Sequence, residues 1–245
     1  MYHFFVTKEQ VSDGEIRVTG SDVNHIKNVL RMKPGEKTVI SDGENRVYLC
    51  VLSGFEGEEA VFRILGELPF ENELPVRITL FQGLPKGDKL EWITEKAVEL
   101  GVYEIVPVAM HRSVVKLDPK KEAKKIERLQ AIAEAAAKQA GRNVIPKVTP
   151  VMTTEKAAEY AKTLDALLVP YECAENMDRT REVIAGLPKS GTIGVVIGPE
   201  GGFEQEELER FTGAGGKVIT LGKRILRTET AGLYVLSVLG FSMSD

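Results

Sequence analysis

With 245 residues, the chain is long enough for one large domain or two of moderate size. Apolar residues make up 43% and charged residues 28% of it, a globular composition that excludes collagen-like and low-complexity chains. The 32 basic and 36 acidic side chains give a net charge of −4, which excludes a uniformly basic nucleic-acid coat protein but not a local basic surface.

The first 70 residues predict a small β-rich domain. Strands are expected at residues 37–41, 46–53 and 60–65, where β-branched and aromatic residues dominate between glycine-containing turns. A helix over residues 21–32 precedes them, with Ser21 as its N-cap and an apolar stripe at Val23, Ile26 and Leu30. Residues 69–75, with two prolines, predict a linker.

From residue 75 the pattern becomes an alternation of strands and helices, which is typical of a parallel sheet covered by helices on both faces. The expected strands are residues 76–81, 104–109, 165–169, 192–197 and 218–221. The expected helices are residues 88–100, 119–140, 153–163, 175–185, 204–212 and 230–242. The chain is therefore predicted to be an α/β protein with domains at residues 1–70 and 75–245. We expect Trp92, Tyr48 and Phe81 in the cores.

Several classes of site lack their sequence signatures. The two cysteines, Cys50 and Cys173, have no CxxC spacing, which argues against a disulfide framework and for a reducing cytoplasm. The three histidines are isolated, so no metal site is expected. Residues 83–89 differ from a phosphate-binding loop because Asp88 stands where Ser or Thr is needed. Neither a signal peptide nor a membrane span is expected, and we predict a cytoplasmic protein.

Two glycine-containing loops follow predicted strands, at the edge of an α/β sheet where ligands bind. Residues 197–203 (IGPEGGF) let the backbone approach a flat ligand, or they form a plain turn. In residues 221–231 (LGKRILRTETA), Arg227 and Glu229 stand at the start of a helix, where an ordinary surface ion pair is the simpler interpretation. Because the two loops share this character, we favour a common pocket.

Two basic surfaces are candidates for RNA contacts. Residues 112–147 hold ten basic and four acidic side chains, and Glu134, Lys138 and Arg142 are spaced by four along one helix face. His25, Asn28 and Arg31 lie three apart on the side of their helix opposite the apolar stripe. Each pattern fits phosphate contacts, and each also fits a solvated helix face.

At these residues the sequence resembles the bacterial 16S ribosomal RNA uridine-N3 methyltransferases (the RsmE family), which belong to the knotted SPOUT methyltransferases. The resemblance covers nearly the whole chain. One difference is that relatives often carry an arginine in the first few residues, where this chain has His3 as a weak substitute. The matching blocks are residues 25–33 (HIKNVLRMK), 82–92 (QGLPKGDKLEW), 99–101, 112–113, 134–142, 197–202 and 221–231.

The resemblance implies a PUA-like β-barrel domain that binds RNA at residues 1–70 and a SPOUT α/β domain with a deep trefoil knot at residues 75–245. It implies a homodimer that uses S-adenosyl-L-methionine to methylate N3 of one uridine in 16S rRNA, position 1498 in standard ribosomal RNA numbering. The partner is 16S rRNA or the small ribosomal subunit. The alternatives are a SPOUT methyltransferase acting on another RNA and a non-catalytic RNA-binding ribosome assembly factor.

The chemistry of this reaction and the resemblance together suggest roles for individual residues. For catalysis we expect Arg227 to stabilise the uridine anion, with Arg142, and Glu229 to act either as base or as the anchor of Arg227. The residues expected to bind the cofactor are Leu168, Val169, Pro170, Gly198, Pro199, Glu200, Gly201, Gly202, Leu221, Ile225, Leu226, Thr230 and Ala231. The residues expected to contact RNA are His25, Lys27, Asn28, Arg31, Lys86, Lys89, Arg112, Arg128 and Lys138.

Overall fold

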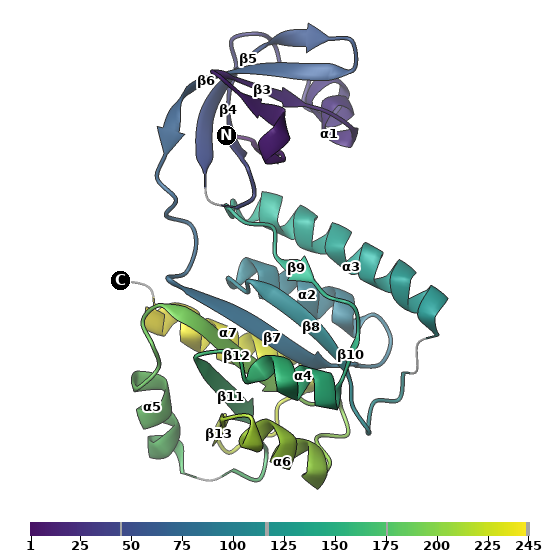
Figure 1. Ribbon diagram of the computed structural model, residues 1–245, viewed down its shortest axis with the longest axis vertical. Coiled ribbons are helices and arrows are strands. Elements are labelled where there is room, and N and C mark those ends of the chain that lie inside the picture. Colours follow the sequence, from purple (N-terminus) through teal and green to yellow (C-terminus); the bar gives the residue numbers. More distant parts are fainter. Residues whose placement is uncertain (45, 116–117, 175, 244–245) are drawn as a thin grey trace. The chain divides into compact units, whose positions relative to one another are not determined.

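The computed structural model describes residues 1–44, 46–115, 118–174 and 176–243 (Figure 1). The chain divides into two compact units. The N-terminal unit comprises Met1–Glu73 and Ala137–Ile145, and the C-terminal unit comprises Leu74–Ala136 and Pro146–Asp245. Residues 69–75 contain no helix or strand. The division thus falls at the expected linker, but the segment Ala137–Ile145 packs with the N-terminal unit, which the sequence pattern did not indicate.

The N-terminal unit is built on a curled six-stranded sheet. All its strand pairs are antiparallel except β1 with β4. The sheet contains the three expected strands, two of them longer than expected, and three strands of two to four residues that are too short to give a periodic signal. In spatial order the strands are β1 (His3–Phe5), β4 (Lys37–Ser41), β5 (Val47–Glu56), β6 (Glu59–Leu68), β3 (Glu15–Val18) and β2 (Val11–Ser12).

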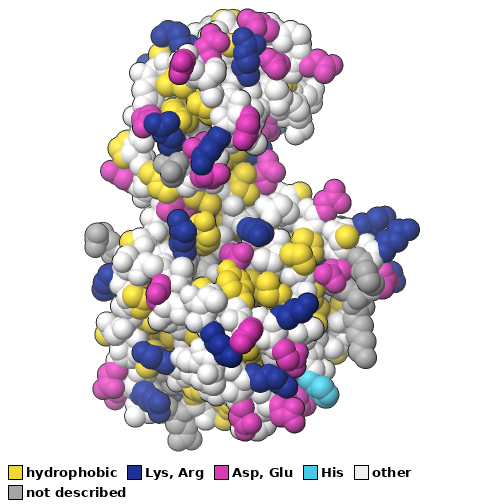
Figure 2. Space-filling model, in the orientation of Figure 1, with side chains coloured by type: hydrophobic (Ala, Val, Ile, Leu, Met, Phe, Trp, Pro, Cys, Tyr) yellow, Lys and Arg dark blue, Asp and Glu magenta, His cyan; other side chains and the backbone are white. Residues whose placement is uncertain are grey.

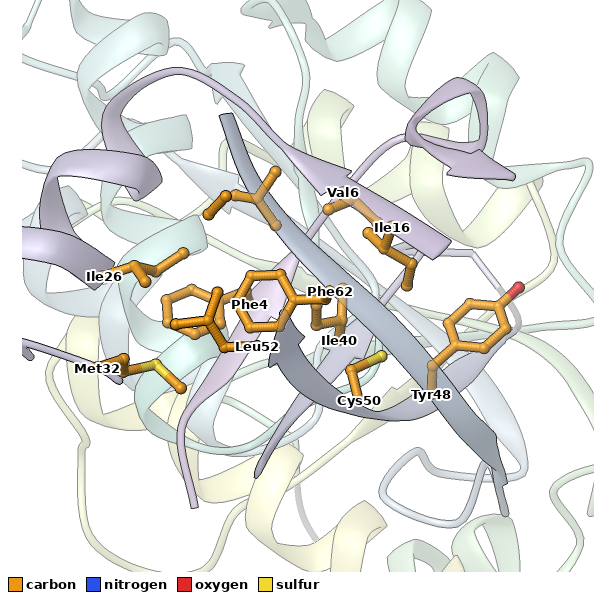
Figure 3. Close-up of a cluster of buried hydrophobic side chains, with 12 residues drawn as sticks. Phe4, Val6, Ile16, Ile26, Met32, Ile40, Tyr48, Cys50, Leu52 and Phe62 are labelled. Carbon is orange, nitrogen blue, oxygen red and sulfur yellow. The ribbon is translucent and has the colours of Figure 1, made fainter. Parts of the chain in front are cut away.

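A short helix closes the core of this unit. Its first turn is α1 (Ser21–Asn24), which continues as the π-helical turn η2 (His25–Val29). The N-cap is Gly20, so the prediction of Ser21 as N-cap is wrong by one residue. Ile26 is fully buried, with Val23 and Leu30 packed against the same core, as the apolar stripe predicted. Figure 3 shows Ile26 among side chains such as Phe4, Phe62 and Leu52 that converge from the strands.

The helix ends earlier than expected. Arg31 has a left-handed backbone with φ +52°, and the N–H of Met32 donates to the carbonyl oxygen of Ile26 at 3.0 Å. The two residues are six positions apart, one more than in the 6→1 bond of a Schellman motif, and the wider π-helical turn η2 covers the start of this span. Ile26 and Met32 are both buried, so the turn is sealed by an apolar contact.

The segment Ala137–Ile145 is attached to the N-terminal unit by polar contacts. The guanidinium of Arg142 pairs with the carboxylate of Glu73, which also accepts the backbone N–H of Asn143 at 2.8 Å and of Val144 at 3.2 Å. Arg142 is 4% exposed. The expectation that Arg142 continues the face of Lys138 is wrong, because the helix ends at Gln139 and Gly141 turns the chain with φ +66°.

The C-terminal unit is a seven-stranded sheet in which every strand pair is parallel, as predicted. Beyond the five expected strands it includes β9 and β10, which have two residues each. Most of the strands lie in the order β10 (Met152–Thr153), β8 (Glu104–Ala109), β7 (Val76–Gly83), β12 (Gly191–Ile197), β11 (Ala166–Pro170) and β13 (Gly216–Ile219), with β9 (Lys147–Val148) beside β8.

Helices cover both faces of this sheet (Figure 1). On one face α7 packs against α2, α5, β7 and β12, while on the other α4 packs against α6 and β8. The expected helix start at residue 175 lies outside the described residues. The helices are α2 (Lys89–Glu99), α3 (Pro119–Gln139), α4 (Thr154–Ala161), α5 (Met177–Ala185), α6 (Gln205–Gly213) and α7 (Thr228–Met243).

One expected core residue is at the surface. Phe81 and Tyr48 are buried, as predicted, but Trp92 is 46% exposed. The buried stripe of α2 passes through Leu90, Ile93 and Ala97, and Trp92 lies beside this stripe rather than in it. None of the described helices is both long and apolar enough to cross a bilayer.

The pairing of Arg142 with Glu73 gives the first prediction. We expect Glu73→Ala to lower the free energy of unfolding by about 3–5 kcal/mol, because it leaves a buried guanidinium without its counter-charge. Chemical denaturation of the full chain measures this loss. The matched control is Glu73→Leu combined with Arg142→Met, which removes both charges and should cost far less. Equal losses of unfolding free energy in the two variants would show that the cost does not come from leaving the Arg142 guanidinium unpaired.

Candidate active site

Three loops meet at the carboxyl ends of neighbouring parallel strands and enclose a pocket of about 370 Å³. They follow β11, β12 and β13, and because β11 lies between the other two strands, their ends are adjacent. The lining residues are Lys89, Pro170, Tyr171, Glu172, Ile197, Gly198, Pro199, Glu200, Gly202, Phe203, Thr220, Leu221, Gly222, Lys223, Arg224, Ile225, Leu226, Arg227, Thr228 and Ala231.

A buried hydroxyl holds the start of α7 against two of these strand ends. Thr228 Oγ1 donates to the carbonyl oxygen of Gly198 at 2.6 Å and accepts from Nε2 of Gln82 at 2.8 Å. Gln82 is fully buried at the end of β7, and its Oε1 has no hydrogen-bond partner among the described residues. The network joins β7, the loop after β12 and α7, so the shape of the pocket depends on it.

The backbone of the loop after β12 lies directly on β7. A Cβ atom placed on Gly83 would be 2.6 Å from the backbone nitrogen of Pro199. Nothing larger than a hydrogen atom fits there without moving Pro199. The glycine is therefore required by a close backbone approach, which is one of the uses of glycine that a sequence does not reveal.

An ion-pair bridge forms one wall of the pocket. Nζ of Lys89 lies 2.8 Å from Oε1 of Glu200 and 3.3 Å from Oε2 of Glu229. Hydrogen bonding to Glu200 is the largest cause that raises the pKa of Lys89. Lys89, expected to contact RNA, is thus engaged with two acidic side chains, one from the loop after β12 and one from α7.

Arg227 and Glu229 are not paired with each other in the structure. Arg227 is exposed at the pocket, and its side chain has no ion pair or hydrogen bond within the described part of the chain. Glu229 is held by Lys89 instead, with its side chain 15% exposed. Arg142, the third expected catalytic residue, belongs to the N-terminal unit, where Glu73 binds it.

The expected cofactor residues fall into two groups. Those that line the pocket are Pro170, Gly198, Pro199, Glu200, Gly202, Leu221, Ile225, Leu226 and Ala231. Four others do not line it. Leu168 and Val169 are buried within β11, Thr230 is exposed on the first turn of α7, and Gly201 lies under Arg112, whose Cβ would be 2.8 Å from an added Cβ.

Sequence reasoning missed some lining residues. Phe203, Gly222, Lys223, Arg224 and Thr228 lie inside the loops predicted at residues 197–203 and 221–231 but were not assigned to the cofactor, and Glu172 and Thr220 lie outside those two loops. Each lies within a few positions of an expected residue, directly after a strand or before a helix. Extending the prediction along the full loops would have found them, because a loop that bends around a ligand contributes several successive residues.

The expected RNA contacts are distributed over both units. His25, Lys27, Asn28 and Arg31 are all exposed on or just after the short helix of the N-terminal unit. In the same unit, Nζ of Lys138 pairs with Asp22 at 3.0 Å.

The surroundings of His3 give only weak support to the expectation that its side chain replaces the arginine found near the start of relatives. Its ring stacks on Phe5 with centroids 5.0 Å apart, and burial lowers its pKa. Its Nε2 is buried and has no partner among the described residues. Because a lowered pKa favours the neutral ring, His3 is a poorer phosphate ligand than an arginine would be.

Of the other expected RNA contacts, Lys86 is exposed and two are engaged within the C-terminal unit. Arg112 donates to Glu204 at 2.8 Å and to the carbonyl oxygen of Gly201 at 2.9 Å, so it supports the loop after β12. Arg128 pairs with Glu91 at 2.7 Å. The described residues include no cluster of histidine, cysteine and acidic side chains able to hold a metal ion.

The comparisons with known proteins agree with this geometry. A family model described as an RNA methyltransferase domain matches residues 72–240, and one described as an RNA methyltransferase PUA domain matches residues 18–65. The fold and its two matched domains thus define an RNA methyltransferase with a PUA domain.

Individual relatives identify the family. The ribosomal RNA small subunit methyltransferase E of Bacillus subtilis is 37% identical over 98% of this chain and 95% of its own. The enzyme of the same name from Neisseria gonorrhoeae, solved bound to S-adenosyl methionine, is 32% identical with a TM-score of 0.82, covering 98% of this chain and 97% of its own. A putative methyltransferase from Legionella pneumophila, solved with S-adenosyl methionine as cofactor, is 30% identical with a TM-score of 0.82, covering 97% and 96%. The chain belongs to the ribosomal RNA small subunit methyltransferase E family.

The contact between Gly83 and Pro199 gives the second prediction. We expect Gly83→Ala to displace the loop after β12 and to weaken ligand binding in the pocket at least tenfold, as measured by calorimetry with S-adenosylmethionine. The control is Gly213→Ala in α6, where an added Cβ meets no atom within 4 Å. Unchanged affinity of Gly83→Ala for S-adenosylmethionine would contradict the need for glycine at this position.

Proposed function

We propose that this protein transfers a methyl group from S-adenosylmethionine to N3 of a specific uridine in 16S ribosomal RNA. The observation that carries the proposal is the pocket at the carboxyl edge of the sheet, with an unpaired arginine and a half-buried carboxylate beside it, in a chain of this family. Residues 75–245 would form the methyltransferase domain, residues 1–70 the RNA-binding domain, and the cytoplasm, where ribosomes assemble, would be the site of action.

The residues of the pocket fit this cofactor. Its volume of about 370 Å³ lies within the range of small-molecule sites, roughly 300–1,000 Å³. Phe203 and Leu226 offer apolar surface for a flat base, and the loop at Gly198 and Gly202 offers backbone groups for hydrogen bonds. When bound, S-adenosylmethionine supplies a methyl group that its sulfonium already activates, so the protein has only to orient the acceptor and remove its proton.

The arrangement of Arg227 suits stabilisation of the acceptor. Loss of the N3 proton spreads negative charge over the two carbonyl oxygens beside it, and a guanidinium can donate to such an oxygen. Arg227 is exposed at the pocket and has no partner among the described residues. It can therefore reach an incoming base without first breaking an ion pair. Because N3 is buried in a base pair, the target uridine must be unpaired or flipped out.

Of the two roles considered for Glu229, we propose the base rather than the anchor. Its Oε2 lies 3.3 Å from Nζ of Lys89, is buried, and accepts no hydrogen bond within the described residues, so this oxygen retains the capacity to accept a proton. A carboxylate that anchors Arg227 would contact its guanidinium, and Glu229 contacts Lys89 instead. We propose that Glu229 receives the N3 proton and that Lys89 keeps the carboxylate oriented.

The N-terminal unit offers the proposed docking face for RNA. His25, Lys27, Asn28 and Arg31 are all exposed, and Lys27 also lies over the ring of Phe55 with Nζ 5.5 Å from the centroid. Basic side chains position the backbone, and an amide can bind a base edge.

A second copy of the chain is the proposed protein partner. On the packed pair of helices α2 and α7, the exposed aromatic side chains are Trp92 at 46%, Tyr234 at 39% and Phe241 at 89%. Large aromatic groups on neighbouring helices are typical of an interface. This pair of helices is therefore the surface on which the proposed homodimer would form.

The function is tested by mapping methylated nucleotides in ribosomal RNA from cells with and without the protein. We expect one uridine of 16S rRNA to lose an N3 methyl group when the protein is absent. A modification lost from a different RNA would favour the alternative substrate. Intact modification together with no binding of S-adenosylmethionine would favour a non-catalytic assembly factor.

Substitution of Arg227 gives the third prediction. We expect Arg227→Ala to lower the rate of methyl transfer by about 10²–10³, the usual cost of removing one donor to a developing anion. Affinity for S-adenosylmethionine, measured by calorimetry, should stay within about twofold. Arg227→Lys should retain part of the rate because it keeps the charge. Normal turnover by Arg227→Ala would exclude the role.

Substitution of Glu229 gives the fourth prediction. If the carboxylate takes the N3 proton, Glu229→Gln should be slow at neutral pH and should recover as the pH rises, because uridine then ionises without help. The pH–rate profile of methyl transfer measures this recovery. Lys89→Met is the companion variant, which should slow the reaction while keeping the wild-type shape of the profile. A Glu229→Gln profile parallel to that of the wild type would rule out Glu229 as base.

A further inference from the structure

The segment between β13 and α7 is tied down at both ends and carries its charge in the middle. At its start, the N–H of Thr220 donates to Thr180 Oγ1 at 3.0 Å. At its end, Thr228 is fixed to Gly198 and Gln82. Between these anchors lie Lys223, Arg224 and Arg227, all exposed. We call the three the basic lip of the pocket.

The basic lip is unneutralised. Within the described residues, none of its three side chains forms an ion pair or a side-chain hydrogen bond. Other cations nearby differ, since Lys89 and Arg112 pair with acidic partners. On the face shown in Figure 2, basic and acidic side chains are interspersed. Three unpaired cations thus stand within five positions at the mouth of the pocket, on a chain with a net charge of −4.

The proposed cofactor cannot neutralise this charge. Four cationic and two acidic side chains line the pocket, and Lys89 already holds one of those acids, Glu200. S-adenosylmethionine carries a sulfonium and an ammonium against a single carboxylate, so its net charge is positive and its binding increases the surplus. A polyanion at the mouth of the pocket would relieve it.

We propose that Lys223 and Arg224 bind the phosphates next to the target nucleotide, so that the basic lip is a second RNA contact besides the N-terminal unit. This inference rests on the proposed function, since it names the surface that presents the uridine to the pocket. Phosphate contacts fix the register of a strand without reading its sequence. Holding the backbone on both sides of a flipped uridine leaves Arg227 free to face the base. The anchors at Thr220 and Thr228 keep the lip from moving away.

The test measures RNA binding by the full chain without S-adenosylmethionine, using the ribosomal RNA fragment that contains the mapped uridine. We expect Lys223→Ala with Arg224→Ala to reduce the slope of log affinity against log salt by about 1.4, or about 0.7 for each phosphate of a single strand. In methyl transfer, KM for RNA should rise while kcat changes little. The matched control is Lys156→Ala with Lys217→Ala, which removes two exposed cations of the same unit that do not line the pocket.

Two further measurements make the result decisive. Calorimetry with S-adenosylmethionine should show a much smaller loss of affinity for the double alanine variant than its loss of RNA affinity, and Lys223→Arg with Arg224→Lys should keep the wild-type salt slope. An unaltered slope in the double alanine variant overturns the proposal, and a lowered cofactor affinity with that unaltered slope would assign the lip to the cofactor's carboxylate. A wild-type protein that binds the fragment but does not methylate it would refute the proposed function, whereas the salt slopes would still decide whether the lip binds RNA.

Discussion

The hydroxyl of Thr228 is the contact on which the pocket depends. It joins the first residue of α7 to the carbonyl of Gly198 and, through Gln82, to the end of β7. These residues are far apart along the chain, with Gln82 and Thr228 separated by 146 positions. Because Gly83 lets Pro199 rest on the same strand end, the loop after β12 and the start of α7 can share one small volume. A parallel sheet supplies this opportunity, since its strand ends all meet at one edge.

Charge is distributed around this frame in two ways. On one wall Lys89 is balanced by Glu200 and Glu229, an arrangement that orients the carboxylates. On the segment between β13 and α7 the basic lip has no counter-charge within the described residues. Paired charges give a rigid wall, and unpaired charges give a surface that attracts an anion. The paired charges therefore suit a small ligand inside the pocket, and the unpaired charges of the basic lip suit a polyanion at its mouth.

The segment Ala137–Ile145 shows a different use of charge. Arg142 is buried with Glu73 and two backbone N–H groups donate to the same carboxylate, while Lys138 pairs with Asp22. Two basic residues that a sequence analysis assigns to catalysis or RNA therefore fasten the end of α3 to the N-terminal unit. A cation in a helical pattern does not tell whether its partner is a substrate or another part of the same chain.

Sequence patterns were enough to predict the alternation of strands and helices, the parallel sheet, the apolar stripe at Ile26 and two loops that line the pocket. These follow from local periodicity and from the turn chemistry of glycine and proline. Three other features emerge only in the folded chain: Glu229 pairs with Lys89 rather than with Arg227, Arg142 is buried, and Trp92 is exposed. The physical reason is that each of these depends on which side chains from distant segments come within a few ångströms, and no local pattern in the chain carries that information.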